Sequence, residues 1–329
     1  MAISHRTRLE NTLSGEKPDR IPVALWHHFP VDDQNPTSLA NATIAFQNRF
    51  DFDFVKVMPT SSFCLKDWGI KDKWQGNIEG TRTYTKRAIQ EPEDWLKLKV
   101  LDPLRGHLGD QLKCLEILQD AFTEQIPFIQ TIFNPLSQVK NLLGDEQLCT
   151  HLRVYPDALH RGLETITETT IRFIETAKTF GIAGTFFAIQ HASFQILSTK
   201  EYEAFGKRYD LEILESVKDL WLNMVHIHGS DIMFDLISDY PVQIINWHDQ
   251  ETKPSLSEGL NKFQGTVCGG LGRIDPLVLG NMKDIKEQAK LAYKQTKGKR
   301  LILSTGCVVP LNTPYGNILA ARQSVEDLA

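Results

Sequence analysis

Two histidines and a distant cysteine are the residues of this sequence best suited to chemistry. His226 and His228 are separated by one residue in the segment VHIHG, which has the composition of a β-strand. Residues at positions i and i+2 on a strand point to the same face, so both imidazoles can reach one metal ion. Cys307 follows a second apolar run, in STGCVVP, and can bring a thiolate to the same point.

These three side chains supply nitrogen and sulfur ligands, which suit Zn²⁺ with a fourth tetrahedral position open for water or substrate. The pattern therefore indicates a catalytic zinc site. Three alternatives stay open: a buried HxH strand with Cys307 as a small apolar filler, a metal-free nucleophile pair of Cys307 and a histidine, and Cys268 as a ligand instead. The remaining cysteines, which we expect to be structural, are Cys64, Cys114 and Cys149.

Apolar, β-rich runs recur along the chain and are the elements that must position this site. Their near-continuous hydrophobicity is typical of a parallel sheet covered by helices. The eight runs are residues 21–26, 54–59, 128–133, 184–189, 223–228, 242–247, 266–271 and 301–306. Because helical patterns alternate with them, we predict an α/β (β/α)8 TIM barrel as a single domain over residues 1–329, with a doubly wound open sheet as the second choice.

Helix ends and one hairpin can also be read from the sequence. Residues 156–180 carry one apolar stripe after an initial proline. A capping box, Ser198 with Glu201, starts another helix, and residues 282–298 form a third that ends at a glycine. Residues 74–89 predict a small hairpin within the second connection from strand to helix.

Polar side chains follow most of the predicted strands, where a barrel of this kind has its active site. Six of the ten histidines stand at such ends, which favours function over the packing role that each would have alone. Arg273, in GGLGR, can clamp a substrate carboxylate, although a surface ion pair is the commoner role. The residues that we expect to line a substrate pocket are His27, His28, Gln190, His191, Asn246, His248 and Arg273.

The bulk properties fit an enzyme acting on small molecules in the cytoplasm. The chain has 329 residues, 41% hydrophobic content and a net charge of −5, which argues against a nucleic-acid partner. We find no signal peptide and no apolar run long enough to span a membrane. Five scattered cysteines are a poor disulfide framework and indicate reduced thiols.

Several segments together carry a resemblance to the uroporphyrinogen decarboxylase superfamily, whose barrel also hosts zinc- and cobalamin-dependent methyltransferases. The resemblance runs almost from end to end. The segments are TRLENTLSGEKPDRIPV, FNPLSQVKNLLGD, HASFQILSTKEYEAFGKRY, VHIHG, GGLGRIDP and STGCVVPLNTPYGNILAA. Within this superfamily the decarboxylase carries an arginine-rich RQAGRY stretch and a catalytic aspartate, where this chain has ALWHHFP and VMPTSS.

The methyltransferase branch is similar to this chain in an HxC strand motif and in a distant cysteine within a GC sequence, which together bind zinc. On that resemblance His226 and Cys307 match two of the ligands, and His228 stands where the family has a cysteine. Exchanging a thiolate for a neutral imidazole adds one positive charge, so the zinc should be a stronger Lewis acid and a bound thiolate a poorer nucleophile.

The resemblance thus implies zinc-dependent methyl transfer between a corrinoid, such as methylcobalamin, and a small substrate. The second substrate could be a thiol such as coenzyme M or homocysteine, or a methyl donor whose leaving atom needs activation. His226, His228 and Cys307 would then be both metal ligands and catalytic residues, and the corrinoid would arrive free or on a partner protein. The alternatives are a carboxy-lyase acting on a porphyrinogen and a barrel kept only for binding.

Overall fold

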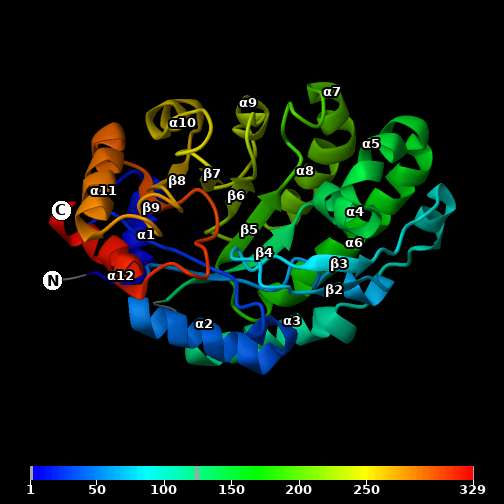
Figure 1. Cartoon of the computed structure of the whole chain (residues 1–329), viewed down its shortest axis with the longest axis horizontal. Helices are drawn as coiled ribbons and strands as arrows, with labels where there is room; N and C mark the ends of the chain where they lie inside the picture. Colours follow the sequence, from blue (N-terminus) through cyan, green and yellow to red (C-terminus); the bar gives the residue numbers. More distant parts are fainter. Residues whose placement is uncertain (1–2, 123–125, 329) are drawn as a thin grey trace.

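Seven parallel strands form the central sheet in the computed structural model of the chain, which describes residues 3–122 and 126–328 (Figure 1). They run in the sheet order β1, β4, β5, β6, β7, β8, β9, and each pairs with its neighbours in parallel. Their carboxyl ends therefore meet at one edge. The strands are β1 (Val55–Val57), β4 (Phe128–Phe133), β5 (Gly184–Ile189), β6 (Met224–Ile227), β7 (Ile244–Trp247), β8 (Thr266–Leu271) and β9 (Leu301–Thr305).

Helices connect these strands and lie outside the curled sheet (Figure 1). They are α1 (His5–Ser14), α2 (Pro36–Phe50), α3 (Gly106–Ala121), α4 (Pro135–Leu143), α5 (Asp145–Val154), α6 (Pro156–Lys178), α7 (Thr199–Tyr202), α8 (Arg208–Ser216), α9 (Phe234–Ile237), α10 (Leu256–Lys262), α11 (Met282–Thr296) and α12 (Tyr315–Ser324). A π-helical turn, Glu203–Lys207, joins α7 to α8. Short 3-10 turns cover Asp32–Gln34, Lys66–Trp68, Pro92–Lys97 and Glu326–Leu328. Among the described residues no helix combines the length and apolar character that a membrane crossing needs.

The helix starts predicted from the sequence are confirmed, and two helices end two residues earlier than predicted, α6 at Lys178 and α11 at Thr296. Helix α6 begins at Pro156 and buries its apolar stripe, with Leu159 and Leu163 fully covered. The Ser198 side chain accepts from the backbone amide of Glu201, and the Glu201 carboxylate accepts in return from the amide of Ser198. Helix α11 ends at Thr296 and is followed by two residues with positive φ.

The first predicted strand, residues 21–26, is the one that the sheet does not contain. This segment forms a single parallel bridge from Val23 to Leu303 on β9. On its other side the amide of Val23 donates to the carboxylate of Asp53 rather than to a backbone carbonyl, at 2.7 Å. Pro22 has no amide proton to donate. The sequence predicts eight strands, and the fold that the structure supports is α/β with a curled parallel sheet of seven.

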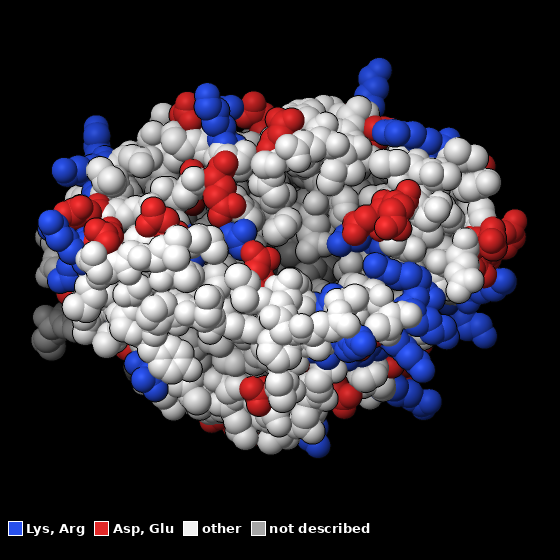
Figure 2. All heavy atoms as spheres, in the orientation of Figure 1, with Lys and Arg blue, Asp and Glu red and all other residues white. Residues whose placement is uncertain are grey.

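The predicted hairpin is present and covers the carboxyl edge of the sheet. Its strands are β2 (Lys71–Lys73) and β3 (Thr83–Lys86), which pair antiparallel, so the first strand precedes the predicted range of 74–89. The connecting residues 74–82, here named the cover loop, contact segments that follow other strands: the amide of Leu311 donates to the carbonyl of Ile78 at 2.7 Å. Near its centre this face of the molecule is hollowed, with acidic and basic side chains around the hollow (Figure 2).

Candidate metal centre

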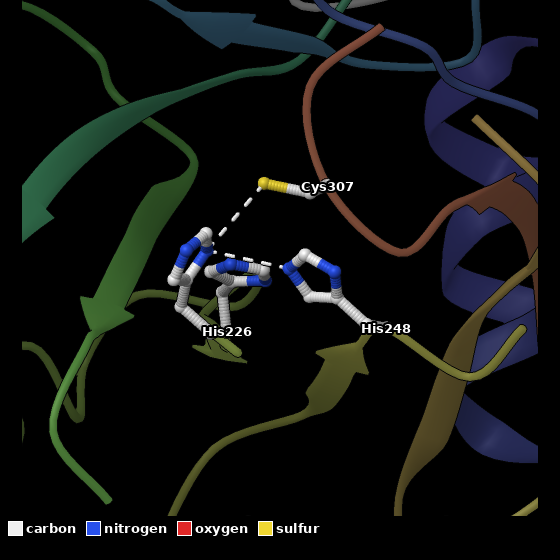
Figure 3. Close-up of side chains that lie close together, drawn as sticks. His226, His248 and Cys307 are labelled. Carbon is white, nitrogen blue, oxygen red and sulfur yellow. Dashed lines mark hydrogen bonds between the residues drawn. The ribbon is translucent and has the colours of Figure 1, made fainter. Parts of the chain in front are cut away.

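Four side chains from three strand ends converge at the carboxyl edge of the sheet (Figure 3). His226 lies on β6, His228 directly after it, His248 directly after β7, and Cys307 two residues after β9. One potential ligand atom from each of the four lies within 4.8 Å of the others. Because parallel strands end at the same edge, residues up to 81 positions apart in the sequence come together here.

Two contacts within this group involve Nδ1 of His228. This nitrogen lies 3.3 Å from Nε2 of His248 and 3.8 Å from Sγ of Cys307. The His228 and His248 rings meet edge to face, with centroids 4.9 Å apart. The sequence analysis expected His248 in the substrate pocket, whereas the structure brings it into this group. A thiol and three imidazoles thus face one point.

Asn246 holds His226 in one tautomer. The amide nitrogen of Asn246 donates to the carbonyls of Cys268 and Thr305, at 2.8 and 3.0 Å, so its Oδ1 faces His226. Nδ1 of His226 lies 2.6 Å from that oxygen and must carry the proton. The register of β6 with β7 places these two residues opposite each other. Nε2 of His226 therefore keeps its lone pair.

His248 is oriented by Glu251, which the sequence analysis did not name, and Glu251 is paired in turn with Arg273. Nδ1 of His248 lies 3.2 Å from Oε2 of Glu251, so the proton is on Nδ1 and Nε2 faces His228. Nε of Arg273 donates to the other oxygen of Glu251 at 2.9 Å, and the same guanidinium contacts Glu79 on the cover loop. Arg273 is therefore held in ion pairs at the rim.

Burial favours the neutral form of His226 and His228. Desolvation, joined by the charges of His228 and His248, lowers the pKa of His226 well below its ordinary value. Desolvation also lowers the pKa of His228, with a smaller opposing effect from the nearby Glu79 carboxylate. A neutral imidazole has a free lone pair, which is the form that binds a metal ion.

The other predicted pocket residues fall into two groups. His27 packs against the rings of Phe29 and Phe46, and the structure does not bring it to the four-residue group. Burial lowers the pKa of His28 and of His191 to about 3 each. The second group shares a buried side-chain atom with no hydrogen-bond partner among the described residues: His28 Nδ1, Gln190 Oε1 and His191 Nδ1.

The remaining cysteines lie outside the group of four in the part of the chain that the structure describes. Cys268, the alternative ligand, is fully buried on β8, and burial raises the pKa of its thiol. Cys64 and Cys114 are buried with the pKa of each raised to about 12 by desolvation. Cys307 is the one free cysteine of the described residues within hydrogen-bonding reach of a histidine nitrogen.

Comparison with protein families finds one model that matches the chain from residue 4 to residue 328, that of uroporphyrinogen decarboxylase (URO-D). The chain is 22% identical over 306 residues to the methylcobamide:CoM methyltransferase MtbA of Methanosarcina acetivorans, covering 90% of this chain and 85% of that protein. It is 23% identical over 300 residues to MtbA of Methanosarcina mazei, with the same coverage. Uroporphyrinogen decarboxylase of Prochlorococcus marinus is 27% identical over 129 residues, 37% of this chain and 35% of that protein.

Solved structures share the fold. A methyltransferase from Methanosarcina mazei superposes with a TM-score of 0.87 at 19% identity, over 99% of both chains. A B12-independent methionine synthase from Shewanella superposes with a TM-score of 0.60 at 14% identity, over 95% of this chain and 94% of the other. The fold is therefore shared with these solved structures over nearly the whole length of the chain.

Proposed function

Because the chain belongs to the uroporphyrinogen decarboxylase family, we propose that it is a zinc-dependent methyltransferase that moves a methyl group between a corrinoid and a small thiol. The observation that carries the proposal is the group of three imidazoles and one thiol, whose potential ligand atoms lie within 4.8 Å of one another. The similarity to two methylcobamide:CoM methyltransferases over 90% of the chain supports the same reaction class.

The donor set fits zinc. Zinc takes nitrogen and sulfur ligands in a tetrahedron, and its bond lengths place neighbouring ligand atoms about 3.3 to 3.8 Å apart. The separations of His228 Nδ1 from His248 Nε2 and from Cys307 Sγ are 3.3 and 3.8 Å. Asn246 and Glu251 accept hydrogen bonds from Nδ1 of His226 and of His248, respectively. Metal-binding histidines are oriented by such a hydrogen bond to the ring nitrogen that does not bind the metal.

In the proposed site His226, His228 and Cys307 would hold the metal, and His248 lies within reach of the same point. Zinc, when bound, lowers the pKa of a coordinated thiol so that the thiolate is present near neutral pH. The Glu251 carboxylate orients His248 through the hydrogen bond to its Nδ1. With Cys307 as its one thiolate ligand, a zinc centre here would carry one net positive charge, which would favour an anionic substrate sulfur.

The transfer itself is a substitution at carbon. The substrate sulfur forms a bond to the methyl carbon as the cobalt–carbon bond of the methylcorrinoid breaks and leaves its electron pair on cobalt, and the thiol proton is released. The corrinoid is a second substrate, free or carried by a partner protein. Unpartnered polar atoms of His28, Gln190 and His191 are available to the substrates, since each is buried without an acceptor or donor among the described residues.

We also propose that residues 21–26 fill the eighth strand position of a (β/α)8 barrel. The metal centre would then lie at the carboxyl end of the barrel. The segment exchanges backbone hydrogen bonds with Leu303 of β9, and the amide of Asp53, just before β1, donates to the carbonyl of Val23 at 2.9 Å. It therefore contacts both edges of the curled sheet.

Decarboxylation of a porphyrinogen is the less favoured function. A substrate with many carboxylates needs several uncommitted cations. Arg273 already pairs with Glu79 and Glu251, and Arg82 on the hairpin pairs with Asp72 and Asp33. Both guanidiniums are thus neutralised by the protein's own carboxylates.

Metal analysis and a demethylation assay test the proposal together. We expect about one zinc per chain after anaerobic purification, and thiol-dependent demethylation of methylcobalamin, followed by its visible absorbance. The double variant Cys307→Ala, His226→Ala should lose both. Cys268→Ala, which removes a buried cysteine outside the group, should keep both. Protein that takes up no zinc, or a double variant that retains turnover, would overturn the proposal.

A further inference from the structure

Asp210 is a buried carboxylate that has no cation beside it. It lies on α8, is fully buried, and forms no ion pair within the part of the chain that the structure describes. Its Oδ2 accepts from the hydroxyls of Tyr202 and Tyr240, at 2.6 and 2.8 Å, and its Oδ1 accepts from Nδ2 of Asn134 at 2.9 Å. Burial raises the pKa of Asp210 to about 6, and these hydrogen bonds oppose the rise without cancelling it. An apolar side chain of this size would avoid the cost of burial, so the carboxylate is better explained by what it orients than by stability.

A π-helical turn places Asp210 where Tyr202 can reach it. Both residues belong to one continuous helical run, Thr199–Ser216, which contains the π turn Glu203–Lys207. Side chains eight positions apart in a regular α-helix differ by about 80° around the axis. A π turn contains one extra residue, so these two side chains are placed as residues seven apart would be, about 20° from each other. Gly206 within the turn leaves room for the Tyr202 ring, which an added Cβ would approach to 2.6 Å. The helix thus departs from regular geometry where it forms this hydrogen bond.

The hydrogen bond from Asn134 begins a path from Asp210 toward the candidate metal centre. Because a carboxylate only accepts, it turns Nδ2 of Asn134 toward itself and Oδ1 toward Ser137. Ser137 donates its one hydroxyl proton to that Oδ1, so its oxygen presents a lone pair to the amide of Gln190, at 3.1 Å. Each group along the path therefore has a defined donor or acceptor role.

The path ends on one peptide unit beside the candidate metal centre. This unit joins Ile189, the last residue of β5, to Gln190, and its carbonyl accepts from the amide of His228 at 2.8 Å. A peptide unit is planar, so its N–H and its C=O keep a fixed direction relative to each other. A rotation that breaks the bond to Ser137 therefore also disturbs the bond to His228.

We propose that Asp210 is a positioning residue for His228. It acts through a path that consists of Asn134, Ser137 and the peptide unit between Ile189 and Gln190. Loosening this path would let His228 withdraw from the point where its Nδ1 meets His248 and Cys307. The inference rests on the proposed function only for the consequence of that withdrawal, a weaker zinc site, because the hydrogen bonds themselves involve no metal.

Zinc affinity in two variants tests the path. Asp210→Leu removes the acceptor of Asn134, and Ser137→Ala removes the acceptor of the Gln190 amide. We expect each to lower zinc affinity roughly 10-fold, the lower end of the loss that follows removal of a group that orients a metal ligand. The double variant should lose no more than the weaker of the two, because both substitutions interrupt one path. Ser137→Ala changes the volume little, so it keeps the test decisive where Asp210→Leu does not fold.

Two further variants separate positioning from stability. Tyr240→Phe removes a donor to the same carboxylate and leaves the bond to Asn134 intact, so it should lose stability and keep zinc affinity. Asp210→Asn should restore affinity, because its oxygen can accept from Asn134 while its amide nitrogen donates to the tyrosine hydroxyls, which also accept. Unchanged affinity in Ser137→Ala, or an equal loss in Tyr240→Phe, would overturn the positioning role.

Hydrogen exchange in metal-free protein separates this inference from the proposed function. Relative to the amides of β7, the amides of Gln190 and His228 should exchange roughly 10- to 100-fold faster in Ser137→Ala, the factor that follows loss of a buried hydrogen bond. In Tyr240→Phe they should exchange as in wild type. Faster exchange in a protein that binds no zinc and methylates no thiol would refute the proposed function and keep the positioning role. Wild-type exchange in Ser137→Ala, in a protein that binds zinc and methylates a thiol, would do the reverse.

Discussion

At the level of single residues, Asn246 decides which nitrogen of His226 is available to a metal, and its replacement tests that role. We expect Asn246→Leu to lower zinc affinity roughly 10- to 100-fold, because the His226 ring loses the acceptor that fixes its tautomer and its orientation. Competition for zinc with a chromophoric chelator measures the change. Zinc affinity is compared between variant and wild-type proteins that are both folded.

Asn223→Leu is the matched control for this substitution. Asn223 is also a buried asparagine beside β6, and its amide nitrogen donates to the carbonyls of Val217 and Leu220. Asn223 directly precedes β6, whereas His226, which faces Asn246, lies near the carboxyl end of that strand. This control should lose stability and keep zinc affinity. If both variants lost zinc to the same extent, the effect would belong to the fold and not to Asn246.

Residue types and spacing predicted His226, His228 and Cys307 as one group, since the HxH pattern places two side chains on one strand face. Which residue stands opposite another depends on strand register, and the sequence does not specify it. The role of Asn246 and the place of His248 therefore became visible only in the structure.

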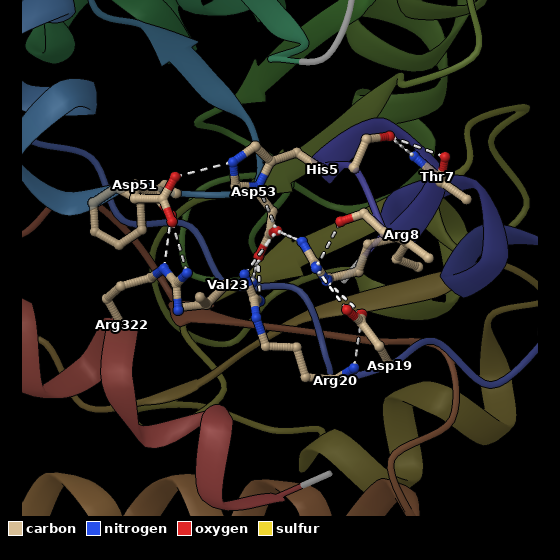
Figure 4. Close-up of polar contacts among 12 residues, drawn as sticks. His5, Thr7, Arg8, Asp19, Arg20, Val23, Asp51, Asp53 and Arg322 are labelled. Atoms are coloured by element: carbon tan, nitrogen blue, oxygen red, sulfur yellow. Dashed lines mark hydrogen bonds and ion pairs between the residues drawn. The ribbon is translucent and has the colours of Figure 1, made fainter. Parts of the chain in front are cut away.

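Among the elements, the junction of α1, residues 21–26 and β1 depends on one buried carboxylate (Figure 4). Asp53 accepts from Arg8 and Arg20 at 2.7 Å each, from the Val23 amide at 2.7 Å and from Nδ1 of His5 at 2.9 Å. The carboxylate is fully buried. The carboxylate thus holds residues 21–26 beside β1, where a regular strand would be held by backbone hydrogen bonds.

We expect Asp53→Asn to lower the free energy of unfolding at pH 7 by about 3–5 kcal/mol, the cost of breaking a buried ion pair. Burial opposes ionisation of Asp53, but the His5 hydrogen bond and the charges of Arg20 and Arg8 hold its pKa well below the ordinary value. The contribution is therefore complete above about pH 4, where an unfolded aspartate ionises, and is lost as the pH falls toward the folded pKa. Urea unfolding from pH 7 to pH 3 should show the two proteins converging.

Asp51→Asn is the control at this junction. Asp51 contacts His5 and Arg322 from an exposed position, and its φ of 53° is one that asparagine adopts readily. Exposed ion pairs contribute about 1 kcal/mol or less, so this variant should remain close to wild type. A loss at Asp51 as large as that at Asp53 would show that burial of the carboxylate is not the cause.

Seven strands could be predicted from apolar runs because each is buried on both faces, which leaves a continuous hydrophobic pattern. Residues 21–26 have the same composition, and composition could not show that the segment fails to form a ladder. The reason lies in Pro22, which donates no hydrogen bond, and in the distant Asp53 side chain that takes the Val23 amide. A tertiary contact thus overrides a local preference for strand.

On the scale of the whole molecule, the cover loop joins the first quarter of the chain to a site built mainly by its last third. Ile78 accepts from the Leu311 amide, beyond Cys307, and Glu79 pairs with Arg273, beyond β8. Gly80 approaches His28 so closely that an added Cβ would overlap the His28 side chain. Three segments that follow separate strand positions therefore contact one loop, and we expect this loop to limit access to the candidate metal centre.

Gly80→Ala should loosen this cover. The added methyl group cannot be accommodated beside Cβ of His28, and the φ of +77° is itself unfavourable for alanine. A loss of one or two kcal/mol in the stability of the closed loop raises the population with an open loop about 5- to 30-fold. We expect amide exchange at Leu311 and extraction of zinc by a chelator to accelerate by that factor. Gly76→Ala is the control, because Gly76 has a φ of +86° and open space around an added Cβ. It carries the same backbone strain without the overlap. Acceleration that is equal in the two variants would mean that backbone strain, and not the contact with His28, governs access to the site.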